Sequence, residues 1–190
     1  MIKAMALALL LAGCIVPEPG VRPGTYDFGQ MEAPAATPGL PVLAISDVQA
    51  PRHLHSTLVY YRLAYSDAQM PKPYADSRWA MPPPQLVAQR LKNRLARHAA
   101  VLSSADAHAD LRLLVELEQF DQVFDSPEQS RGVVVLRASL IRNQKLLAQQ
   151  SFSADKPALS ADGPGGVHAL TQATDAALNQ LADWVQAHAR

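Results

Sequence analysis

Two pairs of side chains have a spacing that could support chemistry, because residues two apart share one face of a strand. His53 and His55 form the first pair, and two imidazoles on one face could bind a metal ion. No third ligand stands nearby in the sequence, so surface histidines beside a turn are the better interpretation. Glu116 and Glu118 form the second pair, as a general acid and base would. They alternate with apolar residues, which favours a solvated outer face.

A glycine-rich loop and scattered serines complete the catalytic candidates. Residues 162–166 (Asp-Gly-Pro-Gly-Gly) precede a helix-like segment and superficially resemble a phosphate-binding loop. The loop lacks the Lys-Ser/Thr pair of a P-loop and the spacing of a dinucleotide fingerprint, so a flexible turn into a helix explains it. Serines such as Ser77 do not lie in a nucleophile-elbow pattern. The sequence therefore predicts no enzyme, no metal site and no cofactor.

The only cysteine, Cys14, has the setting of a lipid attachment point. Lys3 precedes an apolar run over residues 4–11, which is far shorter than the roughly 20 residues that span a bilayer. Residues 11–14 (Leu-Ala-Gly-Cys) resemble the lipobox of bacterial lipoproteins, in which the cysteine thiol is acylated and becomes the mature N-terminus. We therefore expect a signal peptide over residues 1–13. Several acyl chains on Cys14 would form a durable anchor, since each buried methylene contributes about 0.8 kcal/mol.

The residue after the cysteine bears on the membrane that receives the anchor. Ile15 stands where lipoproteins retained in the inner membrane typically carry aspartate, which favours the outer membrane with the domain facing the periplasm. An ordinary secretory signal, or a buried N-terminal helix with a chance cysteine, is the alternative interpretation of this region.

Composition sets the broad class of the protein. The 190 residues are 48% hydrophobic, which suits one domain with a sizeable core. The formal net charge is zero, so nothing indicates electrostatic binding of nucleic acid. A single cysteine excludes an internal disulfide.

Prolines and glycines divide the chain into a tether and a domain. They dominate residues 14–40, which predicts an extended, semi-rigid tether, and residues 25–29 could pair there as a short edge strand. Residues 41–190 are expected to form the domain. The expected fold class is α+β, with a largely antiparallel sheet packed against two long amphipathic helices.

Hydrophobic periodicity places the elements of this fold. Strands are expected over 40–48, 56–65 and 110–120, followed by a hairpin over 132–142 and 145–152 that turns at residues 143–144. One helix should begin after the prolines at 82–84, with an apolar stripe that continues to Ala99 and Leu102. A second helix should carry the stripe that runs from Val167 to Val185.

One region concentrates aromatic and arginine side chains. Residues 60–67 (Tyr-Tyr-Arg-Leu-Ala-Tyr-Ser-Asp) and 73–80 (Pro-Tyr-Ala-Asp-Ser-Arg-Trp-Ala) hold four of the five tyrosines and one of the two tryptophans. Together with residues 26–29 (Tyr-Asp-Phe-Gly) and 165–170 (Gly-Gly-Val-His-Ala-Leu), they resemble the ABC-type transport auxiliary lipoprotein family. The resemblance extends from about Tyr26 to Trp184.

The resemblance implies a non-enzymatic accessory of a transport system. Members of this family serve an inner-membrane ABC permease and ATPase that work with an MCE-domain protein, and they include the lipoprotein of the paraquat-inducible MCE system. Such systems move lipids or other hydrophobic molecules across the envelope. The lipoprotein would dock the periplasmic end of the MCE component from the outer-membrane side. Some members assemble into rings, so the resemblance makes a homo-oligomer an option here.

Three residues of the motif are the expected docking residues: Tyr74, Arg78 and Trp79. Aromatic and arginine side chains dominate the energetics of protein interfaces. The alternative is structural, with Trp79 filling its own core and Arg78 in an internal ion pair. Two other functions stay open. One is an outer-membrane scaffold for cell-wall or envelope assembly, and the other is a periplasmic enzyme with an unrecognised site.

Overall fold

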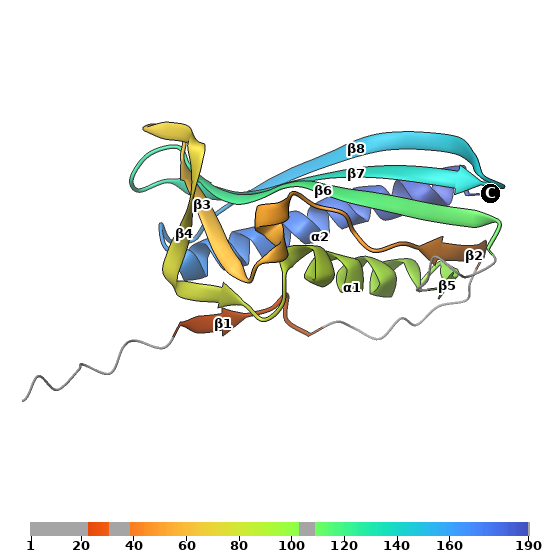
Figure 1. Cartoon of the computed structure of the whole chain (residues 1–190), viewed down its shortest axis with the longest axis horizontal. Coiled ribbons are helices and arrows are strands. Elements are labelled where there is room, and N and C mark those ends of the chain that lie inside the picture. Colours follow the sequence, from red (N-terminus) through yellow and green to blue (C-terminus); the bar gives the residue numbers. More distant parts are fainter. Residues whose placement is uncertain (1–22, 31–38, 103–108, 190) are drawn as a thin grey trace, which may run out of the picture.

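A mixed sheet of eight strands packed against two helices makes up the protein (Figure 1). The computed structural model describes residues 23–30, 39–102 and 109–189. The α+β class expected from the sequence is confirmed. The elements are β1 (Gly24–Tyr26), β2 (Leu40–Ile45), the 3-10 helix η1 (Arg52–His55), β3 (Leu58–Leu63), β4 (Asp67–Trp79), α1 (Pro83–Leu95), β5 (Ala99–Leu102), β6 (Leu111–Phe124), β7 (Ser130–Arg142), β8 (Lys145–Pro157) and α2 (Gly163–His188).

Strand β6 organises the sheet. One edge pairs with β7 along its whole length, and β7 pairs with β8, both in antiparallel fashion. The other edge pairs in parallel with two strands, β2 near its start and β3 near its end. Between these two contacts a single bridge joins Gln49 to Glu116. The long antiparallel ladders thus agree with the expected sheet, while β1, β2, β3 and β5 add parallel pairings.

The β7–β8 turn lies where the sequence indicates, whereas both helices begin a few residues earlier than expected. Asn143 and Gln144 both have positive φ, as a tight hairpin turn requires. Helix α1 begins at Pro83 because a proline at a first helical position costs no backbone hydrogen bond. Helix α2 begins after Asp162, whose carboxylate accepts a hydrogen bond from the Gly165 N–H at 2.8 Å.

One element prediction was wrong, and one strand was not predicted. The first helix ends at Leu95 and does not reach Ala99 or Leu102, which instead lie in β5 beside β2. A strand explains their spacing as well as a helix does, because short apolar runs fit either element. Residues 67–79 form one long strand although it contains Pro71 and Pro73, and no strand was expected there. Proline weakens a strand pattern because it cannot donate to the ladder.

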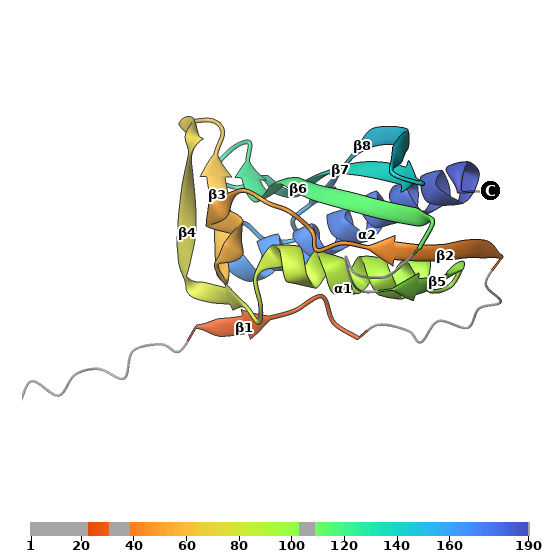
Figure 2. The same cartoon turned by 45° about the vertical axis from the view of Figure 1, so that its right-hand side comes forward.

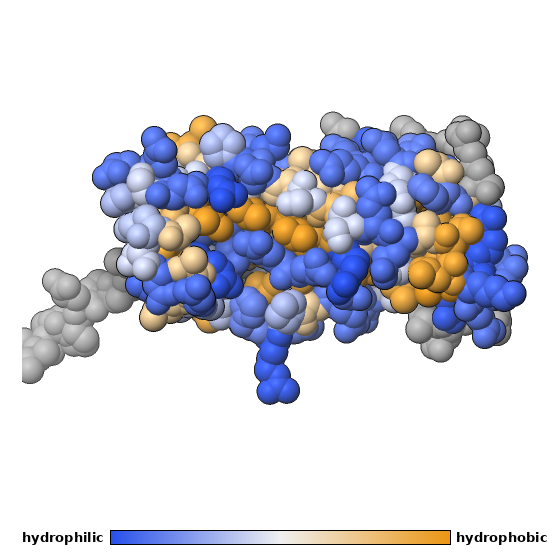
Figure 3. All heavy atoms as spheres, turned by 90° about the horizontal axis from the view of Figure 1, so that it is seen from above, coloured by the Kyte–Doolittle hydropathy of each residue, from blue (hydrophilic) through white to orange (hydrophobic). Residues whose placement is uncertain are grey.

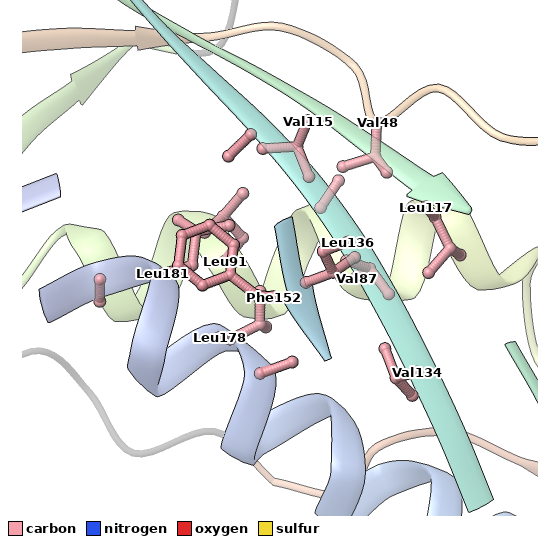
Figure 4. Packing of buried hydrophobic residues seen from close by; sticks show 14 of the residues in the cluster. Val48, Val87, Leu91, Val115, Leu117, Val134, Leu136, Phe152, Leu178 and Leu181 are labelled. Atoms are coloured by element: carbon pink, nitrogen blue, oxygen red, sulfur yellow. The ribbon is translucent and has the colours of Figure 1, made fainter. Parts of the chain in front are cut away.

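Both helices cover the same face of the sheet, and the hydrophobic core lies between the helices and the sheet. Helix α2 packs on β7 and β8, and α1 packs beside α2 (Figure 1). Figure 4 shows side chains from the sheet and from both helices converging. The residues labelled there are all buried: Val48, Val87, Leu91, Val115, Leu117, Val134, Leu136, Phe152, Leu178 and Leu181.

The strands β3 and β4 lie across one end of the molecule, and β1 pairs with the C-terminal end of β4 (Figure 2). Beyond β1, Phe28 is only 7% exposed and packs against Trp79 and Phe120. Residues 24–28 of the expected tether therefore belong to the folded unit. Cys14 and residues 1–13 lie outside the described residues, so the lipid anchor stays a prediction.

Candidate functional site

The residues that carry the family resemblance meet at the end of the molecule formed by β3 and β4. The rings of Tyr61 on β3 and Tyr74 on β4 have centroids 4.6 Å apart. The Tyr74 hydroxyl donates to Gln122 Oε1 on β6 at 2.8 Å. Arg62 follows Tyr61 on β3 and contacts Asp121 on the opposite face of the sheet, and Arg78 lies four residues after Tyr74 on β4. We call Tyr61, Arg62, Tyr74 and Arg78 the aromatic–arginine cluster.

A buried glutamine joins this cluster to the start of α2. Gln122 is completely buried, and its Nε2 donates to the Ser130 hydroxyl at 2.8 Å. A Cβ on Gly166 would lie 1.9 Å from Gln122 Oε1, so only glycine leaves room for the amide. Gly166 belongs to the family-like segment 165–170, and this close approach explains the glycine physically. The sequence offered no signal for Gln122 itself.

Tyr74 is a hydrogen-bond donor held in its neutral form. Burial raises the pKa of the Tyr74 phenol, and nearby Tyr61, Asp162 and Asp76 raise that pKa further. The phenol therefore stays protonated and donates to Gln122. The half-buried ring of Tyr74 still presents part of its surface to solvent.

Arg62 forms an ion pair with a buried carboxylate on β6. Its Nε lies 2.9 Å from Asp121 Oδ2, and the Asp121 side chain is only 2% exposed. Arg62 Nη1 also donates to the carbonyls of Ala68 and Gln69, both at 3.3 Å. The ion pair thus anchors the β3–β4 hairpin to β6.

The three expected docking residues differ in exposure. Tyr74 and Arg78 are half-buried, and Trp79 is 2% exposed. The Trp79 ring lies against Phe28 and Phe120, at centroid distances of 5.7 and 5.5 Å. Arg78 Nη1 donates to the backbone carbonyls of Tyr74 and Ser77, the latter at 2.7 Å. Arg78 is thus held by carbonyls, while Trp79 fills the core directly beneath it.

The catalytic candidates are not brought together. His53 packs edge-on against Tyr60 at 5.5 Å, and His55 Nε2 lies 3.2 Å from the Ala50 carbonyl. In the part of the chain that the structure describes, no group of three or more His, Cys, Asp or Glu side chains could hold a metal ion. Glu116 and Glu118 both pair with Arg137, at 2.7 and 2.9 Å.

The glycine-rich loop and Ser77 serve the packing around the start of α2. Ser77 is 1% exposed, and a Cβ on Gly163 would lie 2.3 Å from its hydroxyl oxygen. A Cβ on Gly165 would lie 2.1 Å from the Ser160 carbonyl oxygen. The glycines of residues 163–166 therefore permit close packing of the first helical turn.

Large apolar side chains are exposed at the opposite end of the sheet, on the face turned away from the helices. Figure 3 looks onto this face and shows hydrophobic surface along its middle and at the end where β2, β5 and the β7–β8 turn lie. The exposed apolar side chains there are Val42, Leu102, Leu114 and Leu146, and in the register Arg112 lies between Leu102 on β5 and Leu146 on β8. We call these four residues the apolar patch, and their exposed fractions range from 38% to 63%.

Comparison with known proteins identifies the family of this chain. The family model for the ABC-type transport auxiliary lipoprotein component matches residues 26–183. The chain belongs to the ABC-type transport auxiliary lipoprotein family. The matched span includes the aromatic–arginine cluster and nearly all of α2. Among curated proteins, none matches.

Solved structures share the fold of this auxiliary lipoprotein. A crystal structure of a Xanthomonas campestris protein, assigned to DUF330, which is the same family, has 18% identity and a TM-score of 0.72. It covers 85% of this chain, and 94% of that protein is covered. An uncharacterised protein has 17% identity and a TM-score of 0.69, with 86% and 99% covered. A hypothetical protein from Chlamydia trachomatis has 9% identity and a TM-score of 0.54, with 80% and 98% covered.

The family assigns an accessory role in transport to the protein. Within the described ranges, no helix combines the length and apolar character needed to cross a membrane.

Proposed function

We propose that this lipoprotein is a non-enzymatic accessory of an MCE-type ABC transport system that moves lipids or other hydrophobic molecules. It would dock the periplasmic MCE component and serve the associated permease and ATPase. The family match over residues 26–183 carries this proposal. The partial exposure of Tyr74 and Arg78 on β4 supports a docking role for that end of the domain.

The proposed anchor is the acylated Cys14 in the outer membrane, with the domain in the periplasm. The lipobox-like residues 11–14 and Ile15 support this location. Between Cys14 and the first residue of β1 lie nine residues, which span at most about 33 Å when fully extended. The docking end, which also contains β1, therefore lies within a short reach of the anchor.

Tyr74 and Arg78 are the proposed contact residues, with Trp79 supporting them from below. A tyrosine and an arginine that are already held in place lose little side-chain entropy on binding, which favours affinity. Because Trp79 is buried, replacing it acts first on the fold. Trp79→Ala is expected to cost about 3–5 kcal/mol of stability. Arg78→Ala is expected to leave the domain folded.

Crosslinking in cells tests the docking surface directly. A photoreactive phenylalanine analogue replaces Tyr74 in one variant and the exposed Gln150 on β8 in a control variant. We expect the probe at position 74 to crosslink to an MCE protein, and Arg78→Ala to weaken that crosslink. The proposal fails if position 74 crosslinks only to cell-wall synthases, which would support the envelope scaffold instead.

Self-association into a ring belongs to the same proposal. The apolar patch supports it, because exposed apolar patches commonly mark protein interfaces. Light scattering on the purified domain measures the mass of the assembly. A monomeric mass at all concentrations would contradict self-association into a ring, but it would not contradict the docking proposal.

A further inference from the structure

Two adjoining hollows lie along β6, in the gap between its contacts with β2 and β3. The first has a volume of about 330 Å³ and is lined by His53, Arg62, Glu118 and Asp121, among others. The second has a volume of about 400 Å³ and is lined by Gln49–Pro51, Glu116–Glu118 and Arg137. Glu118 lines both hollows, so they adjoin at this side chain. We call these two hollows the β6 groove.

A β-bulge in β6 explains why an acidic side chain lies under this groove. The pairing with β7 shifts between Leu117 and Gln119, so the regular alternation of faces changes there. After the bulge Phe120 and Gln122 turn toward the core, and Asp121 turns to the opposite face. The β3–β4 hairpin then covers Asp121 through its pair with Arg62.

The carboxylate of Asp121 is only half satisfied. Oδ2 accepts from Arg62 Nε, whereas the buried Oδ1 has no hydrogen-bond partner among the described residues. Arg62 cannot turn toward Oδ1 without losing its bonds to the carbonyls of Ala68 and Gln69. A buried acceptor without a partner costs about 1–3 kcal/mol, more when it is charged, so a donor at this position would be strongly stabilised.

Arg137, which lines the second hollow, has an unused donor. Arg137 Nη2 contacts Glu116 and Glu118, but its buried Nε has no acceptor among the described residues. Arg137 pairs with Glu116, and Val133 pairs with Asp121, so the two unused groups lie four residues apart along β7. That separation corresponds to about 13 Å, the length of about four extended residues.

We propose that the β6 groove binds an extended segment of the partner protein, whose lysine or arginine side chain donates to Asp121 Oδ1. A backbone carbonyl of the same segment accepts from Arg137 Nε. The groove contains three carboxylates and two guanidinium groups, so its net negative charge selects a basic side chain. This inference rests on the proposed docking function and names the chemistry of the docked segment.

Titration with short peptides tests the groove without any transporter. The probe is acetyl-Ala-Ala-Arg-Ala-Ala-amide, whose central arginine allows either direction of binding, and the matched peptide carries glutamine in place of arginine. Chemical shifts of the Arg62 Nε–H and of the Asp121 amide report occupancy. We expect the arginine peptide to shift both signals and the glutamine peptide to bind about tenfold more weakly, a difference of about 1.4 kcal/mol.

Variants separate the groove from general surface charge. Asp121→Asn and Glu118→Gln are each expected to weaken the arginine peptide about tenfold, whereas Asp155→Asn, an exposed carboxylate on β8, leaves binding unchanged. If Asp121→Asn unfolds, Glu118→Gln decides the question, because it replaces a side chain that reaches solvent. Equal binding of both peptides, or no chemical-shift change at Arg62, would overturn the proposed peptide binding. Water would then be the only partner left for Asp121 Oδ1.

The two proposals fail independently. If the peptides do not bind but position 74 crosslinks to an MCE protein, only the proposed peptide binding in the groove is wrong. Peptide binding together with crosslinks to cell-wall synthases alone would keep the groove and remove the transport function.

Discussion

At the residue scale, the site depends on polar side chains that the fold buries. The Gln122 side-chain oxygen accepts a hydrogen bond from the Tyr74 hydroxyl, and its side-chain nitrogen donates to the Ser130 hydroxyl. Asp121 forms an ion pair with Arg62. Buried polar groups of this kind fix one geometry, because any displacement leaves a donor or acceptor without a partner. This network holds the Tyr74 hydroxyl in place while part of the Tyr74 side chain stays exposed to solvent.

The sequence indicates some of these residues and not others. Tyr74 and Arg78 lie in a visibly aromatic, arginine-containing stretch, so both could be chosen from sequence. Asp121 and Gln122 follow a regular alternating strand, and nothing in the sequence marks the bulge that turns them to opposite faces. The burial of Trp79 was also undecided, since an aromatic side chain suits a core and an interface equally well.

Asp162 gives a prediction with a defined pH dependence. The Ser160 hydroxyl, and then the Gly165 N–H, hold the pKa of Asp162 below its ordinary value of 3.8. Its ionised form therefore stabilises the fold above about pH 4, and that stability is lost as the pH falls through the lowered pKa. Asp162→Ala is expected to cost about 1 kcal/mol at neutral pH.

Urea unfolding of the wild type and of Asp162→Ala, at about pH 7 and about pH 3, measures this dependence. The difference in free energy of unfolding should narrow at the lower pH. Asp162→Asn is the control, because asparagine also caps a helix but does not titrate. A difference that is the same at both pH values would show that the Asp162 charge does not contribute.

At the scale of elements, close contact between α2 and the sheet orders the domain. A Cβ on Gly132 of β7 would lie 2.4 Å from the Leu170 backbone nitrogen of α2. Both groups are backbone or fixed directly to it, so neither can move aside easily. The amphipathic stripe of α2 and the alternation in β7 predict that these elements pack, but not how closely they approach.

Gly132→Ala is therefore expected to destabilise the domain by about 3 kcal/mol, because the new methyl group separates α2 from β7. Gly39→Ala is the matched control, since a Cβ at Gly39 would have no neighbour within 4 Å. Its effect should stay within about 0.5 kcal/mol. Thermal unfolding followed by circular dichroism measures both variants. Equal stability of the two would contradict the packing described here.

Proline and short apolar runs limit what can be predicted at this scale. The long ladders of β6, β7 and β8 alternate regularly, so their existence and hairpin turn follow from sequence. Strand β4 contains Pro71 and Pro73, and β5 continues the apolar spacing of α1. Tertiary pairing decides both of these elements, and pairing partners distant in sequence leave no local signal.

At the scale of the whole molecule, residues 24–28 pack against the core. Phe28 lies against Trp79, and the Ala80 N–H donates to the Tyr26 carbonyl at 2.7 Å. A chain that starts at Pro23 retains these contacts and should keep wild-type stability. A chain that starts at Gly29 loses β1 and Phe28, and should be about 3 kcal/mol or more less stable.

Differential scanning calorimetry of the two shortened chains measures this difference. The two transitions would coincide if residues 24–28 served only as a spacer. A lower transition temperature for the shorter chain alone would show that the segment before residue 29 is part of the domain. The proposed anchor at Cys14 would then be joined to the proposed docking end through β1, because β1 pairs with β4.

The central claim is that the protein serves an MCE-type ABC transporter, and affinity purification of the tagged full-length chain from detergent-solubilised membranes tests it most directly. Mass spectrometry would identify the proteins that co-purify. We expect an MCE protein together with its permease and ATPase, and their recovery should fall with Arg78→Ala. Recovery of cell-wall synthases without any component of an ABC transporter would contradict the account.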